Sequence, residues 1–350
     1  MYPATSDLPD WSKRAIALLN AGIGRGSGRS SLGALDDYRP HLAKLKDKRI
    51  DSLAYLHFGA NSAEQRLYDK LWNIQLNVLR EVITRCTERG ITPYVFKGVE
   101  FLLSCFESRS LGMLFDVDLL VARDDIEEVK AISHAVGLRQ TIFSREKQVL
   151  VGRDVADIAR LESNHYELAP FSQMFRLDLA DDELEIARQW DQHPIYVTEG
   201  NEAIAVVEVD IHHRVALDIE SEPLFARATA SAMQPALTLS SGDLIWFTVS
   251  RFYTEVALNG KRSLRDFAYI AEFIRSKEVD WDVVLGAAVE YDLAPSLFYF
   301  LSFVARFDGV HVPADLLEKL TPIGKRRQRD WGWQLGCLFE FVEGYPLQGI

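Results

Sequence analysis

Two aspartates, Asp116 and Asp118, stand two positions apart in the apolar run FDVDLLV, residues 115–121. This alternation is typical of a β-strand, in which side chains at i and i+2 share one face. Two carboxylates about 7 Å apart on one strand face repel each other, so a strand that carries both usually meets a cation. We therefore expect this pair to bind metal; the alternative is an edge strand whose acids serve solubility.

A second strand is predicted over residues 203–216, AIAVVEVDIHHRVA, and its alternation places Glu208, Asp210 and His212 on one face. Asp210 is the candidate third carboxylate, or else a half-exposed residue paired with a nearby cation. Glu208 could replace it as a ligand or line the pocket on the acceptor side. His212 and His213 point to opposite faces and cannot grip one ion together. A histidine here contacts a phosphate or ribose, or is hydrogen-bonded for structural reasons.

A phosphate-facing turn is predicted before the aspartate pair. The run TPYVF, residues 92–96, reads as a strand that turns at Lys97 and Gly98 into a helix. A helix that begins directly after a strand points backbone N–H groups, and here the Lys97 ammonium, at one place where a phosphate can bind. The alternative is an ordinary strand-to-helix turn with an exposed lysine.

Three further side chains are candidates for the acceptor side. His165 and Glu167 share a face if residues 163–171 form a strand, and Glu167 could act as a general base; a plain strand pair is the alternative. Arg265 lies at the start of a predicted helix. It is a candidate clamp for triphosphate or acceptor, or else a solvated residue.

Helical periodicity predicts the elements that must position these residues. An amphipathic helix is expected at residues 64–89, a second at 124–137 and a third at 179–193. Beyond Pro235 the pattern changes to repeated helices, at residues 242–258, 263–276, 281–292, 294–307, 313–320 and 330–342. The expected organisation is therefore a helical N-terminal arm at 1–60, an α/β core with a mixed sheet at 61–235 and a helical C-terminal domain at 236–350.

Composition limits the classes of protein and partner. The 350 residues include 51 acidic and 39 basic side chains, a net charge of −12, and 48% of them are hydrophobic. The hydrophobic fraction excludes a disordered chain. The charge argues against binding of extended nucleic acid. The basic run KRRQR at residues 325–329 is a solvated helix face, or else it leaves tRNA open as a partner.

The chain is expected to be cytoplasmic. Its three cysteines lie far apart without a CxxC motif, which fits a reducing compartment. The N-terminus lacks a signal-peptide pattern, and no run approaches the ~18 apolar residues that would span a bilayer.

The order of these motifs resembles that of the uncharacterised bacterial nucleotidyltransferase family in the DNA polymerase β-like superfamily. The resemblance covers about residues 60–320 and rests on Lys97-Gly98, Asp116-Val-Asp118, His165-Tyr-Glu167, Val209-Asp210-Ile211-His212 and Leu264-Arg-Asp-Phe. It implies a polymerase β-like α/β (α+β) core in which Asp116 and Asp118 are the metal pair and Asp210 is the third carboxylate. Lys97 and Gly98 would take the place of the superfamily's Gly-Ser phosphate turn, and Arg109 and His212 would contact nucleotide.

The implied activity is nucleotidyl transfer that depends on two Mg²⁺ ions, for which Mn²⁺ is an alternative. An NMP group would move from an NTP, ATP by default, to a small-molecule, peptide or protein acceptor, and pyrophosphate would leave. One rival is a toxin-like enzyme that modifies tRNA or a protein. The other is a degenerate nucleotide-binding or scaffold protein, favoured by Val99 where the superfamily usually has Ser or Gly. The retained aspartate pair argues against the degenerate protein.

Overall fold

The computed structural model describes residues 8–23, 32–163, 165–259 and 263–321. At residues 256–259 it describes the backbone alone. The chain divides into two compact units, one of residues 61–240 and one that combines residues 1–60 with 241–350. The predicted N-terminal arm and C-terminal domain are thus grouped in one unit. The mixed sheet and the residues around its carboxylates belong to the other, which we call the sheet unit.

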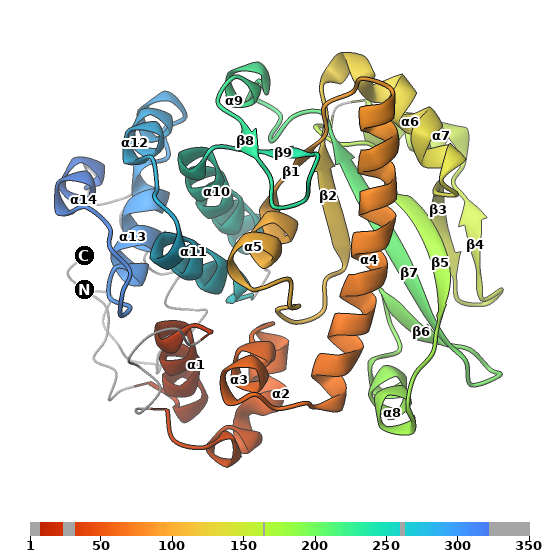
Figure 1. The fold of residues 1–350 in the computed structure, drawn as a ribbon, viewed down its shortest axis with the longest axis horizontal. Coiled ribbons are helices and arrows are strands. Elements are labelled where there is room, and N and C mark those ends of the chain that lie inside the picture. The colour runs from red at the N-terminus through yellow and green to blue at the C-terminus, as the bar shows by residue number, and fades with distance from the viewer. Residues whose placement is uncertain (1–7, 24–31, 164, 260–262, 322–350) are drawn as a thin grey trace. The chain divides into compact units, whose positions relative to one another are not determined.

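Nine strands form one mixed sheet in the sheet unit (Figure 1), which confirms the predicted α/β class. The order is β4-β3-β5-β7-β2-β1-β9-β8, and β6 pairs with β7 beside β2. The pair β2–β7 is parallel, whereas β5–β7 and β1–β2 are antiparallel. The strands are β1 Tyr94–Val95, β2 Asp116–Leu120, β3 Arg139–Ser144, β4 Val149–Gly152, β5 Phe171–Leu177, β6 Ile195–Val197, β7 Ala203–His212, β8 Thr229–Ala230 and β9 Leu237–Thr238.

The longest strand of this sheet, β7, positions the candidate site. Its odd-numbered residues Val207, Val209 and Ile211 are fully buried, as the β-branched alternation predicts. The even-numbered residues from Glu208 to His212 lie on the opposite face. The predicted strand is therefore confirmed in its main part, although it ends at His212 rather than at residue 216.

Helix α4, Ala63–Glu88, runs along the sheet (Figure 1) and confirms the predicted helix at 64–89. Ser62 caps its start by accepting a hydrogen bond from the Gln65 N–H. Leu67 and Leu71 of α4 pack in one core cluster with Ala205 of β7. Because Ala205 lies on the odd-numbered face of β7, this packing leaves the carboxylates on the other face.

The remaining helices of the sheet unit are short. Helix α8 confirms the helix expected at 179–193, and α6, preceded by a 3₁₀ turn at Arg123–Asp125, confirms the one expected at 124–137. The helices are α5 Lys97–Cys105, α6 Ile126–Ala135, α7 Val155–Glu162, α8 Asp181–Trp190 and α9 Glu222–Phe225.

The strand predicted at residues 163–171 is wrong. The strand begins only at Phe171 and continues to Leu177, and the preceding segment is irregular. Glu167 makes a single bridge to His212, and the His213 and Arg214 N–H groups donate to the Tyr166 carbonyl. This segment therefore folds against the end of β7 instead of forming a strand of its own.

The second unit is helical in its described residues and confirms five of the helices predicted beyond Pro235. Its aromatic core includes Phe267 and Phe300, whose rings stack with centroids 4.3 Å apart. No helix in the described ranges is long and apolar enough to cross a membrane. The predicted helix at 330–342 and the basic run at 325–329 lie outside the described residues. The helices are α1 Asp10–Ala21, α2 Leu42–Asp47, α3 Asp51–Phe58, α10 Ser241–Asn259, α11 Arg265–Ser276, α12 Trp281–Glu290, α13 Ala294–Val304 and α14 Ala314–Leu320.

Candidate active site

Four carboxylates meet where β2 and β7 lie side by side. The parallel register pairs Asp116 with Glu208 and Asp118 with Asp210. Neighbouring strands are about 4.8 Å apart, and paired residues point to the same face. The structure thus brings together the three aspartates predicted as metal ligands, with Glu208 beside them.

Lys97 joins this carboxylate cluster from the start of α5. Its Nζ lies 2.6 Å from Asp118 Oδ1, and each of the two side chains is only 11% exposed. Lys97 has a φ of 55°, a left-handed backbone conformation that costs a non-glycine residue on the order of 1 kcal/mol. The turn predicted at Lys97 and Gly98 is therefore present, and it directs the ammonium to an aspartate. The following Val99 is buried, so an apolar side chain suits that position.

His212 completes the environment of Asp118. Its fully buried Nε2 lies 3.0 Å from Asp118 Oδ1, 3.3 Å from Glu167 Oε2 and 3.1 Å from Lys97 Nζ. Burial and the Lys97 charge lower the pKa of His212 to about 4, so the ring is neutral at pH 7. Because Nε2 faces two carboxylates, we assign the hydrogen to Nε2, which donates to Asp118.

Asp118 and Asp210 differ in how their charges are compensated. Burial alone would raise the pKa of Asp118, but the Lys97 charge and the His212 hydrogen bond hold it well below its usual range. Burial also raises the pKa of Asp210, and repulsion from Asp116, Asp118 and Glu167 raises it further. Asp210 Oδ1 is buried and has no hydrogen-bond partner. The cluster therefore has an excess of negative charge and an unpaired carboxylate oxygen, both of which favour binding of a cation.

The donor set fits a hard divalent cation, since carboxylate oxygens are the ligands that Mg²⁺ prefers. The orphaned oxygen of Asp210 and its repulsion by three neighbouring carboxylates support this fit. Within the described ranges no three His, Cys, Asp or Glu side chains already stand at the spacing of a bound metal. Asp118 is turned to Lys97 instead.

Three of the predicted acceptor-side residues, His165, Glu167 and Glu208, lie around this cluster. His165 Nδ1 is 3.5 Å from Glu167 Oε1, and burial lowers the pKa of His165. The two residues approach each other in the irregular segment and not by strand alternation. Burial raises the pKa of the half-buried Glu208, and the charge of Asp116 adds to the shift.

Sequence reasoning missed His193, which lies in the loop between α8 and β6. Its Nε2 donates to the Phe115 carbonyl at 2.9 Å and lies 3.7 Å from Glu208 Oε2. His193 thus connects this loop to the residue just before Asp116. The sequence carries no periodic signal for it, because the contact joins residues 78 positions apart.

Two predicted arginines contact other groups within their own units. Arg109 Nη2 lies 2.9 Å from Asp69 Oδ2 on α4, and the Arg109 side chain is half exposed. The Ser110 N–H donates to the same carboxylate, so this ion pair fastens the loop before β2 to α4. Arg265 belongs to the helical unit, where its Cζ lies 5.8 Å from the Tyr269 ring centroid.

A family model described as an uncharacterised nucleotidyltransferase matches residues 63–309, well over half of the 350 residues. The chain belongs to this nucleotidyltransferase family. The enzyme therefore carries out nucleotidyl transfer, and the resemblance inferred from the motif order is confirmed. The mixed sheet of the nucleotidyltransferase fits the α/β fold expected for such an enzyme. Neither the curated proteins nor the solved structures gave a match.

The matched segment of the nucleotidyltransferase contains the whole carboxylate cluster together with Lys97, His193 and His212. It also extends through helices α10 to α13 of the helical unit. The first 62 residues precede the matched segment.

Proposed function

We propose that the nucleotidyltransferase moves an NMP group from an NTP, ATP by default, to a small-molecule, peptide or protein acceptor, with Mg²⁺ and with release of pyrophosphate. The observation that carries the proposal is the pairing of Asp118 with Asp210 in the β2–β7 register. Lys97 forms an ion pair with Asp118, whereas burial and three carboxylates outweigh the Lys97 charge at Asp210 and raise its pKa. A buried surplus of negative charge destabilises the folded protein when no ligand is bound. It is useful where a cation and a polyphosphate must bind together.

In this proposal Asp116, Asp118 and Asp210 hold the divalent cations. When bound, these ions supply positive charge that stabilises the phosphates of the reacting nucleotide and the leaving pyrophosphate. Through these ions the three aspartates position the nucleotide for in-line attack, and positioning is the main contribution of a protein to phosphoryl transfer.

Lys97 and the start of α5 form the nucleotide side of the site. Phe96, the residue before the helix, provides no side-chain cap for the first-turn N–H groups. Such N–H groups attract phosphate oxygens, and the Lys97 ammonium adds a full positive charge beside them.

Glu208 forms the acceptor side of the site and is the general base that we favour. A carboxyl group whose pKa is raised is better matched to accepting a proton near neutral pH. Glu167 remains the alternative base, but its Oε2 already faces the His212 ring. A cytoplasmic location is part of the proposal, because three separated cysteines fit a reducing compartment.

The nucleotide and metal requirement can be tested by thermal denaturation. The wild-type protein is heated with each NTP in the presence of Mg²⁺ or EDTA, and pyrophosphate release is followed in parallel. We expect at least one NTP to raise the melting temperature by several degrees, only with Mg²⁺ present. Asp116→Asn and Asp118→Asn should lose the shift, whereas Asp157→Asn, an exposed residue of α7, should keep it. Absence of a shift with every NTP in the wild type would contradict the proposal.

A further inference from the structure

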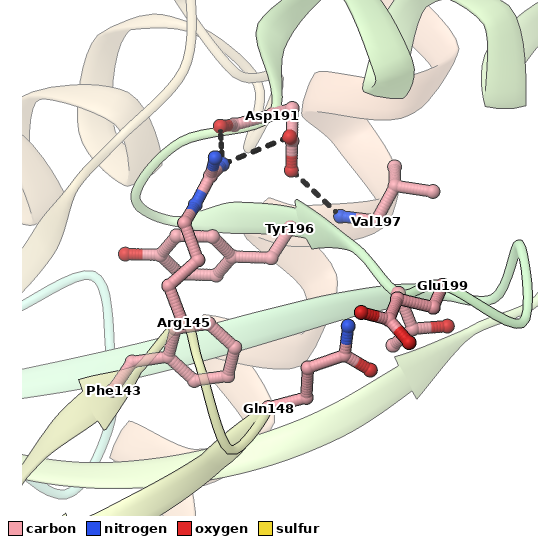
Figure 2. A pocket seen from close by; sticks show the side chains of 8 residues that line it. Phe143, Arg145, Gln148, Asp191, Tyr196, Val197 and Glu199 are labelled. Atoms are coloured by element: carbon pink, nitrogen blue, oxygen red, sulfur yellow. Dashed lines mark hydrogen bonds and ion pairs between the residues drawn. The ribbon is translucent and has the colours of Figure 1, made fainter.

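A polar pocket of about 280 Å³ lies between the end of β3 and the segment that contains β6. Figure 2 shows the side chains that line it, with Phe143 and Tyr196 on one side and Gln148 pointing toward Glu199. The lining includes Phe143, Arg145, Gln148, Tyr196, Thr198 and Glu199. None of the roles proposed above uses this pocket.

The pocket lies on the face of the sheet that carries the carboxylate cluster. Tyr196 is opposite Ile204 in the β6–β7 register, and Ile204 shares its face of β7 with Glu208. Ile204 and Glu208 are four residues apart on β7, a distance of about 13 Å along the strand. Burial is the main cause of the raised pKa of Tyr196, and the charge of Glu208 contributes to it. Both observations place the pocket on the same face of the sheet as the acceptor side of the site.

One loop connects the two places. Asp191, at the end of α8, accepts a hydrogen bond from the Val197 N–H at 3.0 Å and so closes the loop that forms one wall of the pocket. His193 in the same loop lies beside Glu208 and donates to the Phe115 carbonyl. The pocket wall and the entry to β2 are therefore held by the same few residues.

The lining has the chemistry of a site for hydroxylated rings. The Phe143 and Tyr196 rings stack at 4.0 Å and 21°, so each covers one face of the other, and this aromatic wall offers a ligand the outer face of Phe143 and the ring edges. The Arg145 charge is paired with Asp191 Oδ2 at 2.9 Å and lies over the Tyr196 ring. Gln148 and Thr198 can donate and accept hydrogen bonds, and the exposed Glu199 accepts them. Such a lining favours neutral hydroxyl groups or an ammonium and disfavours an anion such as a triphosphate.

We propose that this pocket is the acceptor subsite, and that the acceptor is a carbohydrate of at least two rings. One ring would pack on the Phe143–Tyr196 wall and hydrogen-bond to Gln148, and a hydroxyl of another ring would lie at Glu208. A single ring cannot cover the roughly 13 Å between these two places. This inference rests on the proposed function and names its acceptor class.

The transfer step follows from this placement. The acceptor hydroxyl oxygen forms a bond to the α-phosphorus of the NTP, and the bond from that phosphorus to the bridging oxygen of the β-phosphate breaks. Glu208 accepts the hydroxyl proton, and pyrophosphate leaves with the bridging oxygen. The product is an NMP ester of the carbohydrate, so no oxidant or further reactant is needed.

The subsite is tested by saturation-transfer NMR on the full chain. The probes are soluble di- and trisaccharides built from glucose, galactose, mannose or glucosamine, each with its monosaccharide for comparison. We expect at least one oligosaccharide to bind more tightly than its monosaccharide. The same preference should be seen when ATP and Mg²⁺ are present. A response from the glucosamine series alone would assign an ammonium-bearing ring, and a response from the others would assign a neutral ring. No binding by any oligosaccharide, or displacement by ATP, would overturn the proposal.

Matched variants locate the binding. Phe143→Ala and Gln148→Ala should each weaken oligosaccharide binding at least fivefold. Ile142→Ala is the control, because Ile142 is 48% exposed on the other face of β3. Gln148→Ala leaves the aromatic pair intact and keeps the test valid should Phe143→Ala unfold. Equal binding by Gln148→Ala and wild type would overturn the assignment.

A further variant separates failure of the subsite from failure of the proposed function. Asp118→Asn should bind the oligosaccharide as the wild type does but should not transfer the nucleotide. Oligosaccharide binding without transfer from any NTP in the wild type would overturn the proposed function. Transfer to a non-carbohydrate acceptor that is unaffected by Phe143→Ala would overturn the subsite alone.

Discussion

Lys97 and Asp118 form a buried ion pair that joins the first residue of α5 to the middle of β2, with Nζ and Oδ1 2.6 Å apart. Asp118 is also paired in register with Asp210 on β7. The lysine therefore compensates one carboxylate of a neighbouring pair, and Asp210 keeps an oxygen without a hydrogen-bond partner. This imbalance leads to two opposite mutational predictions.

Asp210→Asn should stabilise the metal-free protein while it abolishes transfer. Burial and three neighbouring carboxylates raise the pKa of Asp210, so its ionised form is destabilising at pH 7. We expect the free energy of unfolding in EDTA to rise by about 1 kcal/mol. Urea denaturation measures it, with Asp157→Asn as the control. A loss of stability would show that Asp210 is compensated in the folded protein.

Lys97→Met should destabilise the metal-free protein, because it leaves Asp118 buried among carboxylates without its counterion. Breaking a buried ion pair from one side costs about 3 kcal/mol. Lys147→Met, in the exposed turn after β3, provides the comparison and should change stability by less than about 0.5 kcal/mol. If both variants unfold at the same urea concentration, the Lys97–Asp118 ion pair does not contribute to the stability of the protein.

The packing of α8 on α4 should depend on pH through Glu183. Burial would raise the pKa of Glu183, but Lys70, Arg66 and the Ala180 N–H lower it below its unfolded value. This contribution is complete above the unfolded pKa of about 4.3 and is lost as the pH falls through the lower folded pKa.

Glu183→Gln should therefore cost about 2 kcal/mol at pH 7, and the difference from wild type should shrink below about pH 4. Urea denaturation at a series of pH values measures this. Glu185→Gln, more exposed on the same helix, is the control. A difference that stays constant from pH 7 to pH 3 would contradict the assigned ion pairs.

Arg109→Ala tests whether this arginine binds nucleotide, as the family resemblance implies. The structure pairs it with Asp69, and its side chain is 50% exposed. We expect stability to fall by less than about 1 kcal/mol and NTP affinity to fall less than in Lys97→Met. Titration of the NTP with Mg²⁺ by calorimetry compares the two variants. A larger loss of affinity in Arg109→Ala would show that Arg109 leaves Asp69 for the phosphates.

The strands and helices with long, regular patterns could be predicted from sequence. β7 and α4 carry ten and 26 residues of consistent periodicity, and the acidic positions of β2 and β7 fell on one face as predicted. The register that sets Asp118 beside Asp210 could not be derived, because strand pairing depends on the whole sheet.

The pocket and the loop of His193 were also beyond prediction. β6 has only three residues, too few to show a period, and His193 contacts Phe115 from 78 positions away. The strand predicted at 163–171 failed because Glu167 meets His212 through a single bridge in an irregular segment. The role predicted for Lys97 assumed a phosphate partner, whereas in the structure the ammonium meets Asp118.

Transfer of label from an NTP carrying ³²P at the α-phosphate tests the central claim most directly. The wild type, incubated with Mg²⁺ and an oligosaccharide that binds, should place α-label on the acceptor and release unlabelled pyrophosphate. Asp118→Asn and Asp210→Asn should reduce the rate at least a thousandfold, whereas Asp157→Asn should leave it unchanged. Undiminished transfer by Asp118→Asn and Asp210→Asn would contradict the account, because the reaction would then occur away from the carboxylates that β2 and β7 bring together.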